Sequence, residues 1–426
     1  MSSLKTDVLI VGSGIGGLYT ALNLDAQLNI TIVTNSKIRD CNSYLAQGGV
    51  TTVIPDDEDS FIEDTLAAGH FKNNHETLKI VARESWKNIK TLIDMGAEFQ
   101  KNENGELKFT KEAAHSKKRI LFHGSETGKM IMETLIENIE KRENITILED
   151  SELLDLKIFK NSVYGGFFRS KNKNFSVDSK IVVLATGGIG GLFKNSTNHE
   201  NIKGISLALA QRHNIEAKDI ECIQLHPTAL DDSSKKRLFL LSEALRGEGA
   251  VIRDAKGERF VDELLPRDKV TESIIKRKNN NNNYQIYLDA TELDSDYIKN
   301  RFEGIYNECF ERGYDITTDL IPISPAQHYF MGGIKTNLKG RSSCQYLYVV
   351  GEAACTGLHG KNRLASNSLL EALVFGRKAA SDINIHIKDI TLTENLASED
   401  EWCPEKAARE IIIRHRGDLK NELRHY

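Results

Sequence analysis

Residues 7–17 read DVLIVGSGIGG, and this stretch decides the fold. Its first five residues form a short apolar run, rich in β-branched side chains, which is typical of a buried strand. Glycines follow at once, and a helical pattern then runs over residues 18–24. A glycine-rich turn between a strand and a helix allows the first N–H groups of the helix to hold a diphosphate. With the apolar run at 29–34 as the next strand, the stretch predicts a β–α–β unit that binds a dinucleotide; a purely structural glycine turn is the alternative.

The end of the second predicted strand lacks an acidic residue. Proteins that bind NAD through such a unit usually carry an aspartate or glutamate there for the ribose hydroxyls, but this chain reads VTNSK at 33–37. Another polar group must therefore take that role, or the ligand is held differently from NAD.

Two further strand ends carry glycine, in ATGG at 185–188 and in GEA at 351–353. Three strand ends that converge on one ligand suit FAD, which is longer than NAD and spans the sheet. Glu352 is then a candidate acceptor for ribitol or ribose hydroxyls. A carboxylate that only stabilises the start of a helix is the alternative for this residue.

The composition excludes several classes of protein. A net charge of −5 over 426 residues argues against general nucleic-acid binding. No apolar run approaches the ~18 residues of a membrane helix, and the N-terminus runs directly into a strand, so we expect neither a membrane span nor a signal peptide. The six cysteines lie apart without metal-ligand spacing, which indicates reduced thiols in a cytoplasmic protein.

The length predicts more than one domain, because single domains usually have about 100–200 residues. Residues 60–96 have a helical pattern, and residues 145–188 are rich in predicted strands. Residues 220–330 mix strands with charged helices and contain four of the six prolines, which indicates an inserted domain. The asparagine run at 279–283 predicts an exposed loop tip. Further helices are expected at 368–380 and 405–416.

Eight further segments occur in the order known from one enzyme family: NSYLAQGGV (42–50), EAAHSKKRI (112–120), LATGG (184–188), LHPTAL (225–230), LLSEALRGEGA (240–250), LPRD (265–268), AQHYFMGG (326–333) and GLHGKNRLASNSLLEALVFG (357–376). Together they resemble the succinate dehydrogenase/fumarate reductase flavoprotein family over about residues 5–380. The resemblance implies an α/β fold with a Rossmann-like FAD-binding domain at 1–220 and 331–385. It also implies an inserted α+β capping domain at 221–330 and a C-terminal helical segment at 386–426, shorter than the family's usual bundle.

The resemblance implies which residues line the FAD. The matching positions are Gly12, Ser13, Gly14, Ile15, Gly16, Lys37, Asn42, Ser43, Tyr44, Leu45, Ala46, Gln47, Gly48, Gly49, Glu352, Ser368 and Leu369. Membrane-bound relatives link FAD covalently through a histidine at the position of Asn42, so we expect non-covalent FAD here. Lys203 stands where the family has an aspartate beside the flavin site, and we assign it no contact with FAD.

The substrates of this family are four-carbon dicarboxylates, which require fixed cations and hydrogen-bond donors in a dry pocket. The matching positions are His226, Ser242, His328 and Arg363, of which the arginine can hold one carboxylate bidentately. Arg267 stands at the position of the proton-donating arginine, which would protonate C3 of fumarate. Glu243 and Arg246 match the relay that returns its proton, although an ordinary helical i,i+3 pair is the alternative.

Glu112 separates the members of this family that oxidise L-aspartate from those that act on dicarboxylates without an amine. Its run, KEAAHSKKR at 111–119, is by itself typical of a solvated surface, above all for its three lysines. Beside a dicarboxylate clamp, however, a carboxylate pairs with an α-ammonium and repels a third acid. We place His115 nearby as a secondary contact.

The resemblance therefore implies oxidation of L-aspartate to iminoaspartate, the first step of NAD biosynthesis, with O2 or fumarate as electron acceptor. The products from the acceptors would be H2O2 and succinate. A soluble fumarate reductase or succinate dehydrogenase flavoprotein is the first alternative, and a flavin-binding electron-transfer module without its own chemistry is the second. The expected partners are L-aspartate and fumarate, with hand-over of iminoaspartate to quinolinate synthase, and neither nucleic acid nor membrane.

Overall fold

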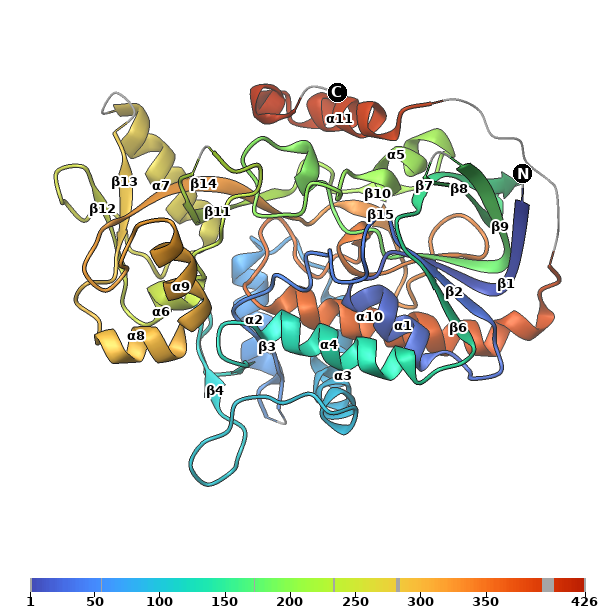
Figure 1. Cartoon of the computed structure of the whole chain (residues 1–426), viewed down its shortest axis with the longest axis horizontal. Helices are drawn as coiled ribbons and strands as arrows, with labels where there is room; N and C mark the ends of the chain where they lie inside the picture. The colour runs from blue at the N-terminus through green and yellow to red at the C-terminus, as the bar shows by residue number, and fades with distance from the viewer. Residues whose placement is uncertain are drawn as a thin grey trace.

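The computed structural model describes residues 2–54, 56–171, 173–232, 234–280, 284–392 and 402–424. The molecule is elongated, with a large twisted sheet at one end and a smaller sheet surrounded by short helices at the other (Figure 1). Helices of the N-terminal half and the long helix α10 (Asn367–His386) fill the space between them.

The large sheet has seven strands, in the order β6-β2-β1-β9-β8-β7, with β16 also paired to β9. Its parallel strands are β1 (Ser2–Val11), β2 (Ile30–Val33), β6 (Ile145–Leu148), β9 (Lys173–Leu184) and β16 (Leu347–Val349). The antiparallel pair β7 (Glu152–Phe159) and β8 (Ser162–Ser170) extends one edge. Apolar side chains such as Val8 and Ile10 are fully buried, as expected for strands covered on both faces.

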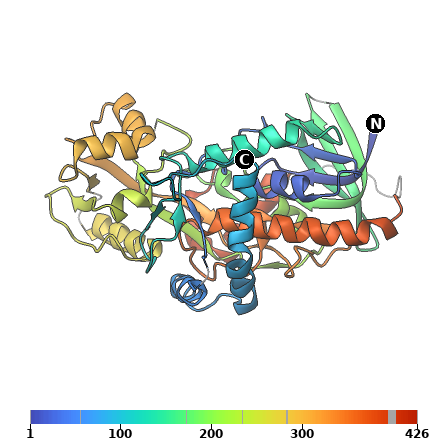
Figure 2. The ribbon, with the colours of Figure 1, turned by 90° about the horizontal axis from the view of Figure 1, so that it is seen from below.

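The predicted β–α–β unit is confirmed, as is the α/β class. Val8 pairs with both Ile30 and Ile181, which places β1 between β2 and β9. Helix α1 (Ile15–Asn23) begins directly after the glycine turn and contacts α10 and α4 (Thr127–Glu140) (Figure 2). The N-terminus of α1 therefore faces the carboxyl ends of the central strands.

The smaller sheet is antiparallel, in the order β11-β14-β13-β12, and has its own apolar core. Its strands are β11 (Ile223–Leu230), β12 (Val251–Asp254), β13 (Ile286–Asp289) and β14 (Ile321–Phe330). The surrounding helices are α6 (Glu243–Gly247), α7 (Arg267–Asn280), α8 (Ser295–Arg301) and α9 (Glu303–Glu311). The domain boundaries at 221 and 330 stay a prediction. The predicted loop tip differs, since residues 279 and 280 end α7, and residues 281–283 lie outside the described part of the chain.

The helical pattern at 60–96 forms two helices, α2 (Glu58–Ala68) and α3 (His75–Asp94). His70 and Phe71 between them adopt positive φ, which ends α2, and Asn74 caps α3 by accepting from two backbone N–H groups. Two small three-stranded sheets complete the core: β3 (Val50–Thr51), β4 (Phe109–Thr110) and β5 (Ile120–Leu121), and β10 (Ala217–Lys218), β15 (Gly333–Lys335) and β17 (Ala354–Cys355).

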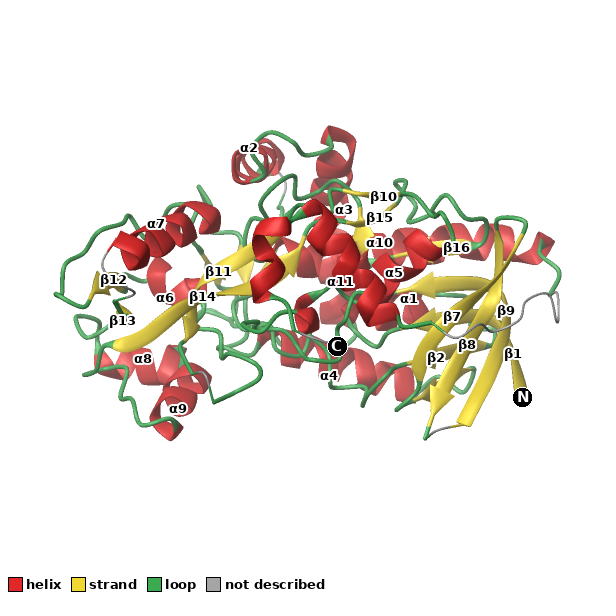
Figure 3. Cartoon of the chain, turned by 90° about the horizontal axis from the view of Figure 1, so that it is seen from above, coloured by secondary structure: helices red, strands yellow, loops and turns green. Residues whose placement is uncertain are grey.

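The C-terminal helix α11 (Pro404–His415) packs on α5 (Ile205–Arg212), close to the large sheet (Figure 3). Its buried residues Ala408, Ile411 and Ile412 form one cluster with apolar side chains of α5. None of the helices in the described ranges is both long and apolar enough to cross a membrane.

Candidate active site

One long cavity runs from the glycine turn before α1 to the smaller sheet. It contains about 1920 Å³ of empty space, its opening to solvent included, which is enough for a dinucleotide together with a small substrate. The end of β1, the end of β9 and the turn after β16 all contribute to its wall.

Several glycines at the ends of β1 and β9 and in the first turn of α1 are too closely packed to carry a side chain. Gly12 has φ +111°, and a Cβ placed on it would collide with the carbonyl oxygen of Ala185. A Cβ on Gly17 would collide with the carbonyl of Gly12, and one on Gly188 would meet the carboxylate of Glu352. Gly12, Gly14 and Gly16 line the cavity with bare backbone beside the N-terminus of α1, which suits the diphosphate of FAD.

Most predicted cofactor residues line the cavity. They are Gly12, Ser13, Gly14, Gly16, Asn42, Ser43, Leu45, Ala46, Gln47, Gly48, Gly49, Glu352, Ser368 and Leu369. Glu352 accepts a hydrogen bond from the N–H of Phe330 at 2.9 Å, and burial raises the pKa of its carboxyl to about 7. A half-buried acceptor of this kind suits hydroxyl donors of a bound FAD.

Three predicted cofactor residues do not line the cavity. Lys37 lies at the surface, where its Nζ is 2.6 Å from Asp150 Oδ2, because this acidic neighbour draws it away. The hydroxyl of Tyr44 donates to Glu133 Oε1 at 2.7 Å. The side chain of Ile15 is buried in the core. For these residues the motif gave the position in the chain but not the direction of the side chain.

Asn42 lies in the cavity wall and holds the chain that follows η1 (Gly190–Leu192). Its amide nitrogen donates to Asn198 Oδ1, and its Oδ1 accepts from the N–H of His199 at 2.9 Å. A carboxamide is not a nucleophile that could form a bond to the flavin. We therefore expect acid precipitation of the purified yellow protein to leave FAD in the supernatant, measured by its absorbance. Yellow colour that stays in the protein pellet would contradict this.

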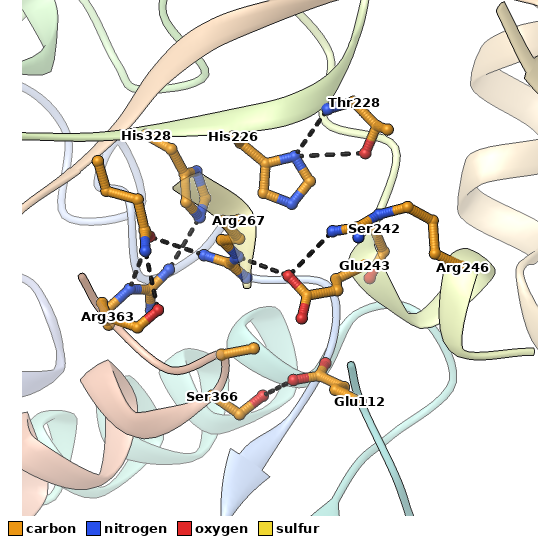
Figure 4. A network of polar contacts seen from close by, with 12 residues as sticks. Glu112, His226, Thr228, Ser242, Glu243, Arg246, Arg267, His328, Arg363 and Ser366 are labelled. Atoms are coloured by element: carbon orange, nitrogen blue, oxygen red, sulfur yellow. Dashed lines mark hydrogen bonds and ion pairs between the residues drawn. The ribbon is translucent and has the colours of Figure 1, made fainter. Parts of the chain in front are cut away.

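The predicted substrate residues come together at the other end of the cavity, from six separate parts of the chain (Figure 4). His226 lies on β11 and His328 on β14, Ser242 and Glu243 are at the start of α6, and Arg267 begins α7. Arg363 precedes α10, and Glu112 lies between β4 and β5.

The two histidines are neutral donors of known tautomer. An arginine can only donate, so the 2.9 Å contact from Arg363 makes Nε2 of His328 an acceptor and leaves the proton on Nδ1, 2.8 Å from Thr197 Oγ1. The N–H of Thr228 donates to Nδ1 of His226 at 3.2 Å, so His226 carries its proton on Nε2. Burial, with Arg267 nearby, holds the pKa of both imidazoles well below the usual range. Nε2 of His226 has no partner among the described residues, and it can donate to a substrate carboxylate.

Arg363 is a buried cation without a carboxylate partner in the described ranges. It contacts Ser368 Oγ and His328 and lies 4.3 Å from the ring centre of Tyr329. Burial, and then repulsion by Arg267, lowers the pKa of its guanidinium to about 10, so it stays charged at neutral pH. A substrate carboxylate would supply the missing counter-charge.

Arg267, Glu243 and Arg246 form a continuous buried chain. Arg267 Nε lies 2.6 Å and Arg246 Nη2 3.2 Å from Glu243 Oε2. Burial raises the pKa of the Glu243 carboxyl, but the two guanidiniums outweigh this and lower it overall. The predicted relay thus has unbroken contacts, although its role in catalysis stays a prediction.

Glu112 is 3% exposed and accepts from Ser366 Oγ at 2.6 Å. Burial, and then repulsion by Glu243, raises the pKa of its carboxyl. Its Oε1 lies where a side chain on Gly48 would have to be, so the glycine of the NSYLAQGGV segment makes room for this acid.

The rest of KEAAHSKKR separates into two groups. Its three lysines are exposed, as expected. Arg119 is 1% exposed and is paired with Asp57 and Asp64 of the α2 region, so the surface interpretation is wrong for this residue. His115 is buried with Nε2 3.1 Å from the carbonyl of Ala365, and burial lowers its pKa to about 4. It supports the Arg363–Ser366 loop and does not line the cavity.

Two residues of this site were absent from the sequence prediction. Gln224 accepts from Arg267 Nη1 at 2.9 Å and donates to the carbonyl of Arg363 at 2.8 Å, so it joins the two arginines. Its place two residues before His226 in the same strand was the available signal. Ser366, which holds Glu112, adopts φ +62° and lies inside the recognised motif around Arg363.

Comparison with known proteins places the chain in a family. A family model described as "FAD binding domain" matches residues 7–369. The chain is 48% identical to the L-aspartate oxidase of Clostridium acetobutylicum, over 99% of both chains. It is 49% identical to that of Clostridium perfringens, over 98% of this chain and 96% of the other. A solved variant of E. coli quinol fumarate reductase shares the fold, with a TM-score of 0.85 and 24% identity over 98% of this chain and 75% of that chain.

The cofactor follows from the family and from the shape of the cavity. The glycine turn at the N-terminus of α1 and the half-buried acceptor Glu352 fit FAD. FAD is therefore the cofactor of this enzyme. The chain belongs to the FAD binding domain family, within the branch that contains the two clostridial L-aspartate oxidases.

Proposed function

We propose that this protein oxidises L-aspartate to iminoaspartate in the cavity between the two sheets. When bound, FAD supplies the acceptor for the hydride that leaves C2 of the substrate. The observation that carries the proposal is Glu112, a buried carboxylate in the cavity wall, which forms no ion pair with any described residue, whereas Glu243 is paired with two arginines. The names of the two clostridial relatives support the same substrate.

The two carboxylates of the substrate bind to the cationic part of the site. Arg363 holds one of them in place of the counter-ion that it lacks among the described residues, and His226 Nε2 donates to a carboxylate oxygen. Ser242 lies in the same wall of the cavity. These contacts hold C2 of the substrate in a fixed position. Such positioning lowers the activation barrier of hydride transfer without any covalent bond between substrate and protein.

Glu112 binds the α-ammonium of the substrate. Because Glu112 is buried, a positive charge beside it is strongly stabilising: an ionised carboxylate without a counter-ion has a high free energy in a buried site. The raised pKa of this carboxyl also suits it to receive a proton from the substrate nitrogen as the C2–N bond becomes an imine. Succinate has no ammonium group, so binding it leaves Glu112 unpaired.

Fumarate reduction is the second reaction that the geometry supports. It needs a proton donor at C3, and Arg267 stands in the cavity wall with Glu243 and then Arg246 behind it. In this proposal Arg267 gives its proton to C3 and recovers one through Glu243. Fumarate thus serves as an electron acceptor in the same site, and O2, giving H2O2, is the alternative acceptor.

Oxygen consumption with a panel of substrates tests the proposal. We expect purified holoprotein to consume O2 and form H2O2 with L-aspartate, and to give rates at least about 100-fold lower with succinate, since a lost buried charge contact costs several kcal/mol. Equal rates with L-aspartate and succinate would refute the role of Glu112 in substrate choice.

The pathway, the partner protein and the location in the cell go beyond what the site geometry supports. Entry of iminoaspartate into NAD biosynthesis agrees with the names of the relatives. Its direct hand-over to quinolinate synthase and a cytoplasmic location stay predictions from the sequence.

A further inference from the structure

The end of β2 marks the part of the cavity where the adenosine of FAD belongs. The diphosphate lies at the turn before α1, and in this fold the ribose extends toward the end of the second strand. Thr34 and Asn35 line the cavity there, and neither is acidic. The amide of Asn35 is already paired, since it donates to the carbonyl of Asn201 at 2.9 Å and accepts from Asn201 Nδ2 at 3.1 Å. The strand end therefore offers no carboxylate for the ribose hydroxyls.

Glu405 brings a carboxylate to the same end of the cavity from the C-terminal segment. It lies in the first turn of α11 and lines the cavity together with Pro404. Its Oε1 is 3.5 Å from Nζ of Lys203, which follows Asn201 by two residues and also lines the cavity. The side chain of Glu405 is 19% exposed. Residues far apart in the sequence thus form one wall around the adenosine end.

The segment that carries Glu405 is firmly anchored. Trp402 donates from Nε1 to the carbonyl of Leu154 at 2.9 Å, and the guanidinium of Arg212 lies 4.6 Å from its ring centre. On the other side of Glu405, Ala408 packs so closely on Gly204 that a Cβ on this glycine would come within 3.2 Å. The position of the carboxylate is therefore set by contacts on both sides, as an acceptor in a binding site requires.

Two other carboxylates line this end of the cavity, and both already accept short hydrogen bonds. Asp40 Oδ2 accepts from Ser36 Oγ at 2.6 Å and closes the turn after β2. Glu152 Oε2 accepts from Arg169 Nη2 at 2.8 Å across neighbouring strands. The contacts of Glu405 are longer: 3.5 Å to Lys203 and 3.4 Å to the thiol of Cys403. Of the three carboxylates at this end of the cavity, Glu405 therefore has the longest contacts with other protein groups.

We propose that Glu405 accepts hydrogen bonds from the adenosine ribose hydroxyls of FAD, in the role that an acid at the end of β2 usually has. The two carboxylate oxygens suit the adjacent 2′ and 3′ hydroxyls, and bonds to an ionised acceptor are the stronger kind. The inference depends on FAD as the cofactor and not on L-aspartate as the substrate. It gives the short C-terminal segment a part in binding the cofactor.

Binding to the apoprotein of the full chain tests this role. The variants are Glu405→Gln and, as a matched control, Glu410→Gln, which alters an exposed glutamate on the same helix. Dissociation constants are measured for FAD by flavin fluorescence, and for ADP, 2′-deoxy-ADP and 3′-deoxy-ADP by competition. We expect E405Q to bind FAD about tenfold more weakly and E410Q to bind it like the wild type. Wild-type protein should prefer ADP to at least one deoxy form by a similar factor, and E405Q should lose that preference.

Three results would overturn the proposal. If E405Q weakened the binding of ADP and of both deoxy forms by the same factor, Glu405 would only pair with Lys203. A wild-type protein that binds all three nucleotides alike would exclude recognition of the hydroxyls. If Asp40→Asn or Glu152→Gln lost the preference for ADP over the deoxy forms while E405Q kept it, the ribose hydroxyls would be bound by Asp40 or Glu152 instead. Thermal unfolding of each variant checks its fold, and none of these readouts depends on turnover of L-aspartate.

Discussion

We expect Glu112→Gln to lower kcat/KM for L-aspartate by about 10²–10³-fold, because it removes the carboxylate that pairs with the substrate ammonium in a desolvated site. Fumarate has no ammonium, so its reduction should change less than about fivefold. The measurement is a pair of steady-state assays on one preparation, aspartate oxidation with O2 and fumarate reduction with an artificial electron donor. Equal losses in both reactions would rule out ammonium recognition by Glu112.

Thermal unfolding of the E112Q protein shows whether it is folded, and a second variant shows the effect of losing an exposed charge nearby. Glu103→Gln, which alters an exposed glutamate shortly before β4, should leave both activities unchanged. The raised pKa of Glu112 also fixes the sign of the stability change. A carboxyl whose pKa is higher in the folded state binds more protons there, so it destabilises the fold increasingly as pH rises from its unfolded pKa through its folded pKa. The substrate-free E112Q protein should therefore have a Tm at pH 8 at least equal to that of the wild type.

The second large effect is expected for Arg267→Gln. It removes the group placed to protonate C3 of fumarate, so kcat for fumarate reduction should fall by about 10³-fold. Flavin reduction by L-aspartate needs no proton at C3, so it should lose only the charge contact and fall by about tenfold, mainly through KM. Lys276→Gln, an exposed change on the same helix, is the matched control.

The ratio of the two losses distinguishes a proton donor from a binding residue. If fumarate reduction and aspartate oxidation fall by the same factor in R267Q, then Arg267 only binds carboxylate. Glu243→Gln breaks the contact behind Arg267 and should depress fumarate reduction selectively in the same way. E112Q should mainly lose aspartate oxidation, and R267Q should mainly lose fumarate reduction. This contrast would show that the two reactions in one site depend on different residues.

The sequence predicted the parts of this protein that depend on local pattern. The strand, glycine turn and helix at 7–24 have contrasting residue types over short distances, and the structure forms them almost as expected. The residues around Arg363 and Arg267 were identified by their motifs, and they do converge in space (Figure 4). Their chemical roles are what the proposed variants test.

The sequence failed where a side chain depends on distant partners. Lys37 stands in the correct segment but turns toward Asp150, over a hundred positions later. Arg119 looked like part of a solvated run, yet Asp57 and Asp64 bury it. Glu405 lines the same cavity as Gly12, which lies near the other end of the chain, and no local pattern predicts such an approach. Burial of charge is a property of the assembled fold, so a single segment does not reveal it.

Anaerobic mixing of the oxidised holoprotein with single substrates shows which of them passes a hydride to the flavin. Without O2 or fumarate, any hydride removed from the substrate stays on the flavin, and the loss of its yellow absorbance reports the reaction alone. L-Aspartate should bleach the flavin completely and in the first turnover, whereas succinate at the same concentration should leave the absorbance unchanged. Bleaching by succinate, or a flavin that stays yellow with L-aspartate, would contradict L-aspartate oxidation as the selective reaction of this site.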